Sequence, residues 1–309
     1  MKKILLAASI MLSVAVQAQE TDTTKNWTQG GDAGLNFSQS SFTNWAAGGE
    51  NALSLTAYTN VFANYKKGED AWDNSLSLAY GMLQSGHAAV RKNEDKIDFT
   101  SKYGRYAFAK HWYYSALLTA KTQFADGYNY PNDSVPISRF AAPAYITAAV
   151  GLDYKTTDNT FTLFISPATL KTTIVNDRTL ARAGAYGVDA AEYDTAGVLV
   201  KEGKKVRYEL GGYIRAQFKK DIAKNVNLAT KLELFSNYLD RPQNIDVNWE
   251  VLINMKINKF LSCNLATQMI YDNDIPVPVE RMENGINVMG TGPRLQFKEV
   301  LSLGLSVKF

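Results

Sequence analysis

Apart from its carboxylates, this 309-residue chain has few residues able to do acid–base, nucleophilic or metal chemistry. It has two histidines, His87 and His111, and one cysteine, Cys263. A single cysteine cannot form a disulfide framework or a thiolate metal site, and two histidines leave little for a histidine-based one. Hydrolysis by a serine or cysteine needs a base within reach of the nucleophile. The two histidines are expected in loops on opposite sides of the strands described below, so we predict no such pair.

Phosphate-binding glycine loops and EF-hand calcium loops are also absent from the sequence. A pair of carboxylates in the loops is the one catalytic pattern that the composition leaves open. We therefore predict no enzyme, no metal site and no cofactor.

The sequence contains segments, described next, in which every second residue is polar. Charged side chains of both signs lie at these polar positions. Two interpretations stay open: a salt-bridge network that fills a narrow interior, or a constriction that sorts solutes. Pairing of two neighbouring segments would place Glu233 opposite Glu250, within one pair, where bridging by a cation or a shared proton would be needed. The candidate network contains Asp98, Lys102, Lys121, Arg207, Glu209, Arg215, Lys231, Glu233, Glu250 and Lys256.

The elements that must position these charges alternate apolar and polar residues with a period of two, which is the pattern of β-strands. The clearest run is 245–257, where every odd position is Ile, Val, Trp or Met. Most of the segments are longer than the usual strand of about 5–6 residues and suit a tilted span of a membrane. Twelve of them start near Gly31, Asn51, Ala71, Lys96, Trp112, Ala144, Thr160, Val206, Val226, Ile245, Leu261 and Leu295.

The connections alternate between short and long. Even-numbered connections are tight turns, whereas five of the six odd-numbered ones are longer, up to the 35 residues of 171–205. Short periplasmic turns and long outer loops characterise outer-membrane barrels, whereas a secreted β-sandwich, the alternative, would have shorter strands. We predict an all-β fold: an antiparallel up-and-down transmembrane β-barrel of about twelve strands, with both termini in the periplasm. Pro167 predicts a bulge or strand end.

The first residues have the features of a cleaved signal peptide. Lys2 and Lys3 precede an apolar run at 4–16, and Val16 and Ala18 are the small residues of a cleavage site. The alternative is a buried N-terminal helix. The predicted organisation is a signal peptide at 1–18, a short periplasmic segment at 19–30 and the barrel at 31–309. The final residue of the chain, Phe309, lies on the apolar face and resembles the assembly signal of outer-membrane proteins.

Two stretches, Asn-Phe-Ser-Gln-Ser-Ser-Phe-Thr-Asn-Trp-Ala-Ala-Gly-Gly-Glu-Asn at 36–51 and the run at 60–81 that ends in Leu-Ala-Tyr-Gly, carry a family resemblance. They resemble the exported Bacteroidota family of domain of unknown function 3078. The resemblance implies an outer-membrane protein of that lineage, and it implies no catalytic residues.

Two outer loops contain candidate contact residues. Trp45 stands before Gly48 and Gly49, in what is either a structural hairpin or an anchor that binds the lumen or a partner. The 171–205 loop is long enough to be functional. It either folds as a flap that gates the lumen or presents Tyr186 and Tyr193 to a partner, or else it extends the strands as a raised hairpin.

The net charge of +3 gives no support to nucleic-acid binding. We expect a protein exported to the outer membrane of a Gram-negative bacterium. Its expected partners are outer-membrane lipid, the secretion and barrel-assembly machinery during biogenesis, and an envelope protein. Two functions remain: a narrow pore or transporter for small polar solutes, or a non-conducting accessory barrel that docks into a larger envelope assembly.

Overall fold

The computed structural model describes residues 26–41, 50–275, 277–283 and 286–309. The expected signal peptide at 1–18 and the loop around Trp45 lie outside these residues. None of the described helices is long and apolar enough to cross a membrane.

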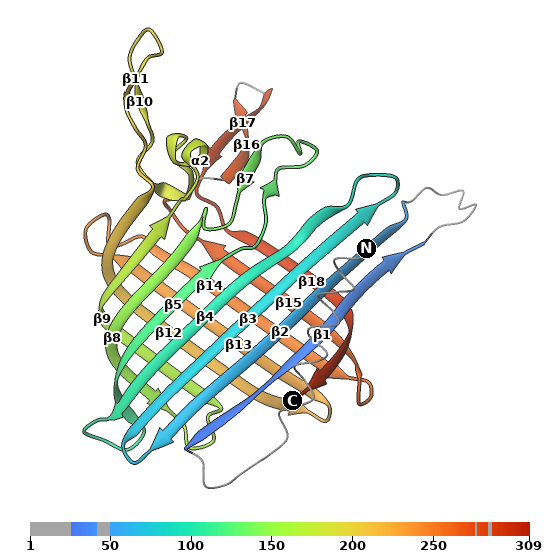
Figure 1. The fold of residues 1–309 in the computed structure, drawn as a ribbon, viewed down its shortest axis with the longest axis vertical. Coiled ribbons are helices and arrows are strands. Elements are labelled where there is room, and N and C mark those ends of the chain that lie inside the picture. The colour runs from blue at the N-terminus through green and yellow to red at the C-terminus, as the bar shows by residue number, and fades with distance from the viewer. Residues whose placement is uncertain (1–25, 42–49, 276, 284–285) are drawn as a thin grey trace.

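Twelve antiparallel strands close into a barrel, as the alternation predicts (Figure 1). Strands that follow each other in the ring are hydrogen-bonded neighbours, and β1 closes the ring against the last strand, β18. The strands of the barrel are β1 (Trp27–Ser40), β2 (Ala52–Lys67), β3 (Asp70–Ser85), β4 (Arg91–Tyr106), β5 (Trp112–Thr122), β8 (Ala144–Lys155), β9 (Phe161–Ile174), β12 (Val206–Ala223), β13 (Val226–Asn237), β14 (Ile245–Lys256), β15 (Leu261–Tyr271) and β18 (Gln296–Lys308).

Two strands begin earlier than the sequence predicts. Strand β1 begins at Trp27 rather than near Gly31, so part of the segment expected to be periplasmic belongs to the barrel. Strand β4 begins at Arg91 rather than near Lys96. The register with β3 shifts there, because Gly81 pairs with Glu94 and Met82 with Lys92. The extra residue of this β-bulge interrupts the alternation on which the prediction depends.

Pro167 forms the predicted bulge within β9. Val150 pairs with Ala168 but Leu152 pairs with Ile165, so two residues of β9, Ser166 and Pro167, oppose the single residue Gly151 of β8. Gly151 accommodates the bulge, because a Cβ at this position would collide with the carbonyl of Ile165. Since proline donates no backbone hydrogen bond, a bulge lets it lie within a closed sheet.

The two ends of the barrel differ. The five even-numbered connections, of two to five residues each, lie at one end, which we call the short-turn end (Figure 1). At the other end, the three longest connections form structure of their own. These added elements are β6 (Gly127–Tyr128), β7 (Pro136–Ser138), α2 (Arg178–Arg182), η1 (Ala185–Gly187), β10 (Glu192–Tyr193), β11 (Leu199–Lys201), β16 (Val277–Glu283) and β17 (Ile286–Gly292).

The connection between β9 and β12, residues 175–205, is hereafter called the flap. Its helices pack against the mouth, where Val175, Leu180, Ala181 and Val188 are buried together with Ala142 of a neighbouring loop. The side chain of Asp177 caps α2 by accepting from the backbone N–H of Leu180 at 2.9 Å. Beyond this packed part, the β10–β11 hairpin projects away from the barrel (Figure 1). The segment therefore combines the folded flap with a short raised hairpin.

Candidate functional site: the charged lumen

Ion pairs cross the middle of the lumen from one wall to the opposite wall. Strands β4 and β14 are six steps apart in the ring of twelve, so they face each other across its diameter. Lys96 of β4 lies 3.3 Å from the carboxylate of Glu250 on β14 and 3.7 Å from Asp98. Lys231 of β13 contacts the same two carboxylates, at 2.9 Å from Glu250 and 3.5 Å from Asp98. These four residues are hereafter called the crossing layer.

Glu233 is the centre of a second group of contacts at the same level. It pairs with Lys121 of β5 and accepts hydrogen bonds from the Tyr213 hydroxyl at 2.7 Å and from Asn248 at 3.0 Å. The register places Glu233 opposite Asn248, whereas Glu250 is opposite Lys231. Glu233 and Glu250 therefore do not face each other as predicted, because the register differs from the predicted one by one pair of residues on the same face. The actual register aligns opposite charges, which removes the repulsion between like charges.

Nearer the mouth, a third group surrounds Lys171 and Arg207. The Lys171 ammonium lies 2.6 Å from Asp246 and 3.7 Å from both Glu209 and Asp272. Arg207 pairs with Glu209 at 3.0 Å and with Asp274 of the outer connection. Six charged groups from four parts of the chain thus join the upper strands to the loops above them.

Toward the short-turn end, Lys102 lies 2.7 Å from Asp153, a fully buried carboxylate on β8. Lys155 is 3.7 Å from the other oxygen of Asp153 and also pairs with Asp73 of β3. Charge pairs therefore join non-adjacent strands across the lumen at three levels of the barrel.

Two residues of the candidate network have different environments. Arg215 is buried and directs Nη1 toward the Thr100 hydroxyl at 3.5 Å. Lys256 is exposed at the short-turn end of β14. The other eight residues form the ion pairs described above.

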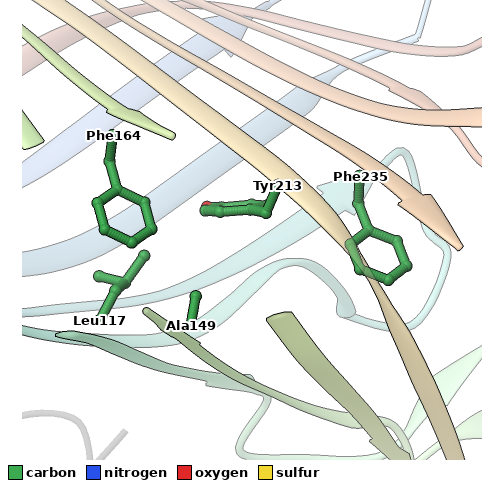
Figure 2. Close-up of a cluster of buried hydrophobic side chains, with 5 residues drawn as sticks. All are labelled: Leu117, Ala149, Phe164, Tyr213 and Phe235. Atoms are coloured by element: carbon green, nitrogen blue, oxygen red, sulfur yellow. The ribbon is translucent and has the colours of Figure 1, made fainter. Parts of the chain in front are cut away.

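One wall of the lumen is apolar, which the sequence prediction of a polar interior did not include. Leu117, Ala149, Phe164, Tyr213 and Phe235 come from β5, β8, β9, β12 and β13, and their side chains gather inside the barrel (Figure 2). The rings of Phe164 and Tyr213 are 6.3 Å apart, and the Lys171 ammonium lies 5.0 Å from the centre of the Phe235 ring. The sequence contained a signal for this apolar wall, because Leu117, Phe164 and Phe235 occupy inward-facing positions, as the charged residues on neighbouring strands do.

The opposite side of the lumen is open. Leu252 of β14 and Val300 of β18 share inward parity, because both pair with Ala266 of β15, yet they are 43% and 41% exposed. Leu252 follows Glu250 by two residues on β14, so its side chain and that of Val300 lie just below Glu250, toward the short-turn end. Space therefore exists below the crossing layer.

Above the crossing layer is a cavity of about 610 Å³. It extends from Asp98, Glu233 and Glu250 to Tyr186 of the flap. Tyr186 is fixed over this space, because its hydroxyl donates to the carbonyl of Ile137 at 2.6 Å. Burial raises the pKa of Tyr186, so the hydroxyl keeps its proton at neutral pH. Five lysines line the cavity together with seven acidic residues: Lys92, Lys96, Lys121, Lys171, Lys298, Glu94, Asp95, Asp98, Glu233, Asp246, Glu250 and Asp272.

An exposed ion-pair cluster fixes the base of the projecting hairpin. Arg182 contacts Glu202 through Nε at 2.8 Å and Nη2 at 2.6 Å, and Arg178 contacts it at 2.5 Å. The Arg182 and Arg178 guanidinium groups hold the pKa of Glu202 at about 2. Tyr193, the other predicted contact residue of this segment, is 54% exposed on the hairpin. Tyr186 and Tyr193 thus have different environments, one over the lumen and the other in solvent.

The seam between the first and last strands contains Phe309. Its backbone N–H and C=O exchange hydrogen bonds of 3.0 and 2.8 Å with Gly31. A Cβ at Gly31 would approach the Phe309 ring, so glycine lets this ring lie against β1. Farther along the seam, Asn264 donates to Asn36 at 3.2 Å across Gly304.

Residues that suggested chemistry in the sequence are dispersed. His87 is exposed in the β3–β4 connection, and His111 lies in a short turn at the other end with its ring 6.0 Å from that of Tyr154. Cys263 has the outward parity of β15, because it pairs with Leu303 and Met255. No three His, Cys, Asp or Glu among the described residues are arranged to hold a metal ion.

Residues 37–128 match the family described as "Protein of unknown function (DUF3078)". The match supports the family resemblance over that part of the chain. The curated proteins include no match to this sequence.

Solved structures resemble the chain only loosely. The translocator domain of autotransporter NalP from Neisseria meningitidis has a TM-score of 0.35 at 9% identity, covering 98% of this chain and 97% of the other. An outer-membrane channel from Pseudomonas putida F1 has 0.39 at 9% identity, covering 94% and 98%. The outer-membrane channel DcaP of Acinetobacter baumannii has 0.27 at 10% identity, covering 92% and 95%. Such scores carry little information, so the architecture is established by this chain's own strand pairing.

Proposed function

We propose that this protein is an outer-membrane β-barrel that admits small polar solutes to the cavity above the crossing layer, and that this layer limits their passage. The proposal requires the barrel to span a membrane. It is supported by the outward face, where apolar side chains such as Leu118, Val150 and Leu210 are 44–58% exposed. A closed ring of strands satisfies its backbone hydrogen bonds internally, as the hydrocarbon core demands.

The observation that carries the proposal is the order of three features along the lumen. A charged cavity lies above the crossing layer, and exposed inward-facing Leu252 and Val300 lie below it. Among the described residues, only contacts between side chains, and no strand or helix, separate the two spaces at this level. Side chains rearrange much faster than the barrel unfolds, so a few rotamer changes would connect the spaces.

The lining favours small solutes that carry both charges or several polar groups. Lysines and carboxylates lie next to each other in the lining, as Lys96 and Asp98 of β4 do, and as Lys298 of β18 and Glu94 of β4 do. A solute whose charges all have the same sign could bind either the lysines or the carboxylates of the lining, but not both.

The second candidate is a non-conducting barrel that serves as a docking subunit. The direct contact between β4 and β14 favours it, because ion pairs joining opposite walls strengthen a plug. The projecting β10–β11 hairpin, with Tyr193 exposed, would then be the contact with an envelope partner.

Proteoliposome swelling distinguishes the candidates. We expect the intact protein to admit glycine faster than a neutral trisaccharide. Deleting residues 184–196, which include Tyr186, should speed both while folding remains normal, because the roof of the cavity is removed. Replacement of Tyr193 by Ser is the control, since this residue does not line the cavity. Absence of swelling in every solute, with and without the flap, would exclude the channel and leave the docking barrel.

A further inference from the structure

We propose that the rim formed by the short turns binds the phosphate groups of anionic phospholipids in the membrane leaflet that it faces. The inference rests on the proposed insertion in a membrane, but it concerns a different surface from the lumen.

The short-turn rim is rich in lysines that have no counter-charge. Lys67, Lys110, Lys220, Lys224, Lys256 and Lys259 are all exposed. Lys66 and Lys219 lie beside two of them, and Lys308 is exposed at the end of β18. Within the part of the chain that the structure describes, none of these nine ammonium groups lies in an ion pair.

The four acidic residues of the rim are already engaged by other groups. Glu69 lies 3.5 Å from Arg105, and Asp70 accepts from the Tyr103 hydroxyl at 2.7 Å. Asp221 accepts from the Asn227 amide at 2.9 Å. Asp158 accepts from the Thr160 hydroxyl at 2.6 Å, and this bond is the main cause of its pKa of about 2. In the described part of the chain, none of these carboxylates lies in an ion pair with a rim lysine, and the nine lysines outnumber them, so positive charge remains available to an external anion.

Aromatic rings mark the depth of these lysines in the bilayer. Trp27 lies 5.2 Å from Tyr65 and 5.8 Å from Trp72, and Trp112 lies 5.3 Å from Tyr154, all near the short turns. Tryptophan and tyrosine favour the boundary between acyl chains and headgroups. Lys67 follows Tyr65 by two residues, and Lys110 precedes Trp112 by two. Because a strand rises about 3.3 Å per residue, such lysines reach the level of the lipid phosphates.

The other end of the barrel shows a different distribution of charge. Its exposed cations mostly have acidic partners: Lys201 pairs with Glu192 at 2.5 Å, Lys204 with Asp189 at 2.6 Å and Arg241 with Asp240 at 3.2 Å. Among the described residues, unpaired positive charge is therefore concentrated at the short-turn end, where it attracts anionic headgroups.

The distribution around the ring favours lipid over an acidic protein. Unpaired lysines occur in four of the five short turns and at the end of β18, so they encircle the barrel. Lipids surround a barrel on all sides, whereas a docked protein would need its contacts gathered on one side.

The inference is tested by native mass spectrometry of the purified protein with equal amounts of phosphatidylglycerol and phosphatidylcholine. We expect at least tenfold preferential retention of phosphatidylglycerol, declining as salt rises. A rim variant (Lys67→Gln, Lys110→Gln, Lys220→Gln, Lys259→Gln) should lose the preference. A control with the same loss of charge at the other end (Lys201→Gln, Lys204→Gln, Lys205→Gln, Arg241→Gln) should keep it. Heat-modifiable migration in gels verifies that each variant is folded.

Equal retention of the two lipids, an unchanged rim variant, or an equal loss in the control would overturn the inference. So would displacement of the lipid by 10 mM inorganic phosphate or by an acidic polypeptide, since the site would then be a general anion surface. The proposed function fails separately: a protein that inserts into vesicles without lipid preference contradicts only this inference. A folded protein that inserts into neither type of vesicle contradicts both.

Discussion

Glu233 shows most clearly how the lumen depends on single residues. Its carboxylate is buried and meets Lys121, Tyr213 and Asn248, which come from three different strands. A buried carboxylate without these partners would be costly, because water no longer solvates its charge. The residue therefore links the apolar wall to the ion pairs of the interior.

We expect Glu233→Leu to lower the free energy of unfolding by about 3 kcal/mol, because Lys121 and the Tyr213 hydroxyl lose their partner. Lys121 is 29% exposed, which keeps the effect at the lower limit for buried pairs. The double variant Lys121→Met/Glu233→Leu should recover part of this loss. Urea unfolding in detergent micelles, followed by tryptophan fluorescence, measures both. Additive losses in the double variant would show that the two charges do not interact.

Glu202 makes the flap insensitive to mild acid. Its pKa of about 2 lies below the ordinary value, so the interaction with Arg182 and Arg178 is complete above about pH 4.3 and is lost as the pH falls through about 2. We expect a spin-label distance between Ala190→Cys and Asp133→Cys, in a Cys263→Ala background, to stay constant from pH 7 to pH 4. The same protein with Glu202→Gln should show a broader distribution at every pH. A transition near pH 4.5 in the parent protein would contradict this account.

Strands determine which face each of these side chains takes. In β14, Val251 pairs with Thr230 and Thr267 on the outward face, whereas Leu252 pairs with Ala229 and Ala266 on the inward face. Two adjacent apolar residues thus have different surroundings: Val251 lies on the outer face of the barrel, and Leu252 faces the lumen. The β-bulges at Asn93 and Pro167 shift this alternation locally and so change which side chains point inward.

The adjacent pair gives a matched test of membrane insertion. We expect Val251→Arg to block stable insertion, since an arginine on the lipid face near the midplane costs about 2–4 kcal/mol. Leu252→Arg should insert normally, because its side chain faces the exposed part of the lumen. Flotation with liposomes and heat-modifiable migration measure the folded, inserted fraction. Equal behaviour of the two variants would contradict the assignment of faces.

At the scale of the whole molecule, the sequence predicts the twelve strands, their faces and the two kinds of connection, because these follow from a period of two and from loop length. It predicts that Lys231 and Glu250 face inward, but not that Lys96 reaches Glu250. That contact joins residues 154 positions apart, and it depends on strand tilt and interior radius, which no local pattern encodes. The apolar wall escaped prediction for another reason: parity places Phe164 and Phe235 inside, but only the assembled barrel shows that they meet.

The crossing layer decides the function of the whole molecule, because it separates the cavity above it from the space below it. Conductance in a planar bilayer tests this separation most directly. Replacing all four residues of the layer (Lys96→Ser, Asp98→Ser, Lys231→Ser, Glu250→Ser) removes two positive and two negative charges, so the net charge stays the same. The control, Glu192→Ser/Lys201→Ser, removes one balanced pair from the projecting hairpin. The account predicts several-fold higher single-channel conductance in the first variant and an unchanged value in the control. A folded, inserted layer variant with the same conductance as the unmodified protein would contradict it.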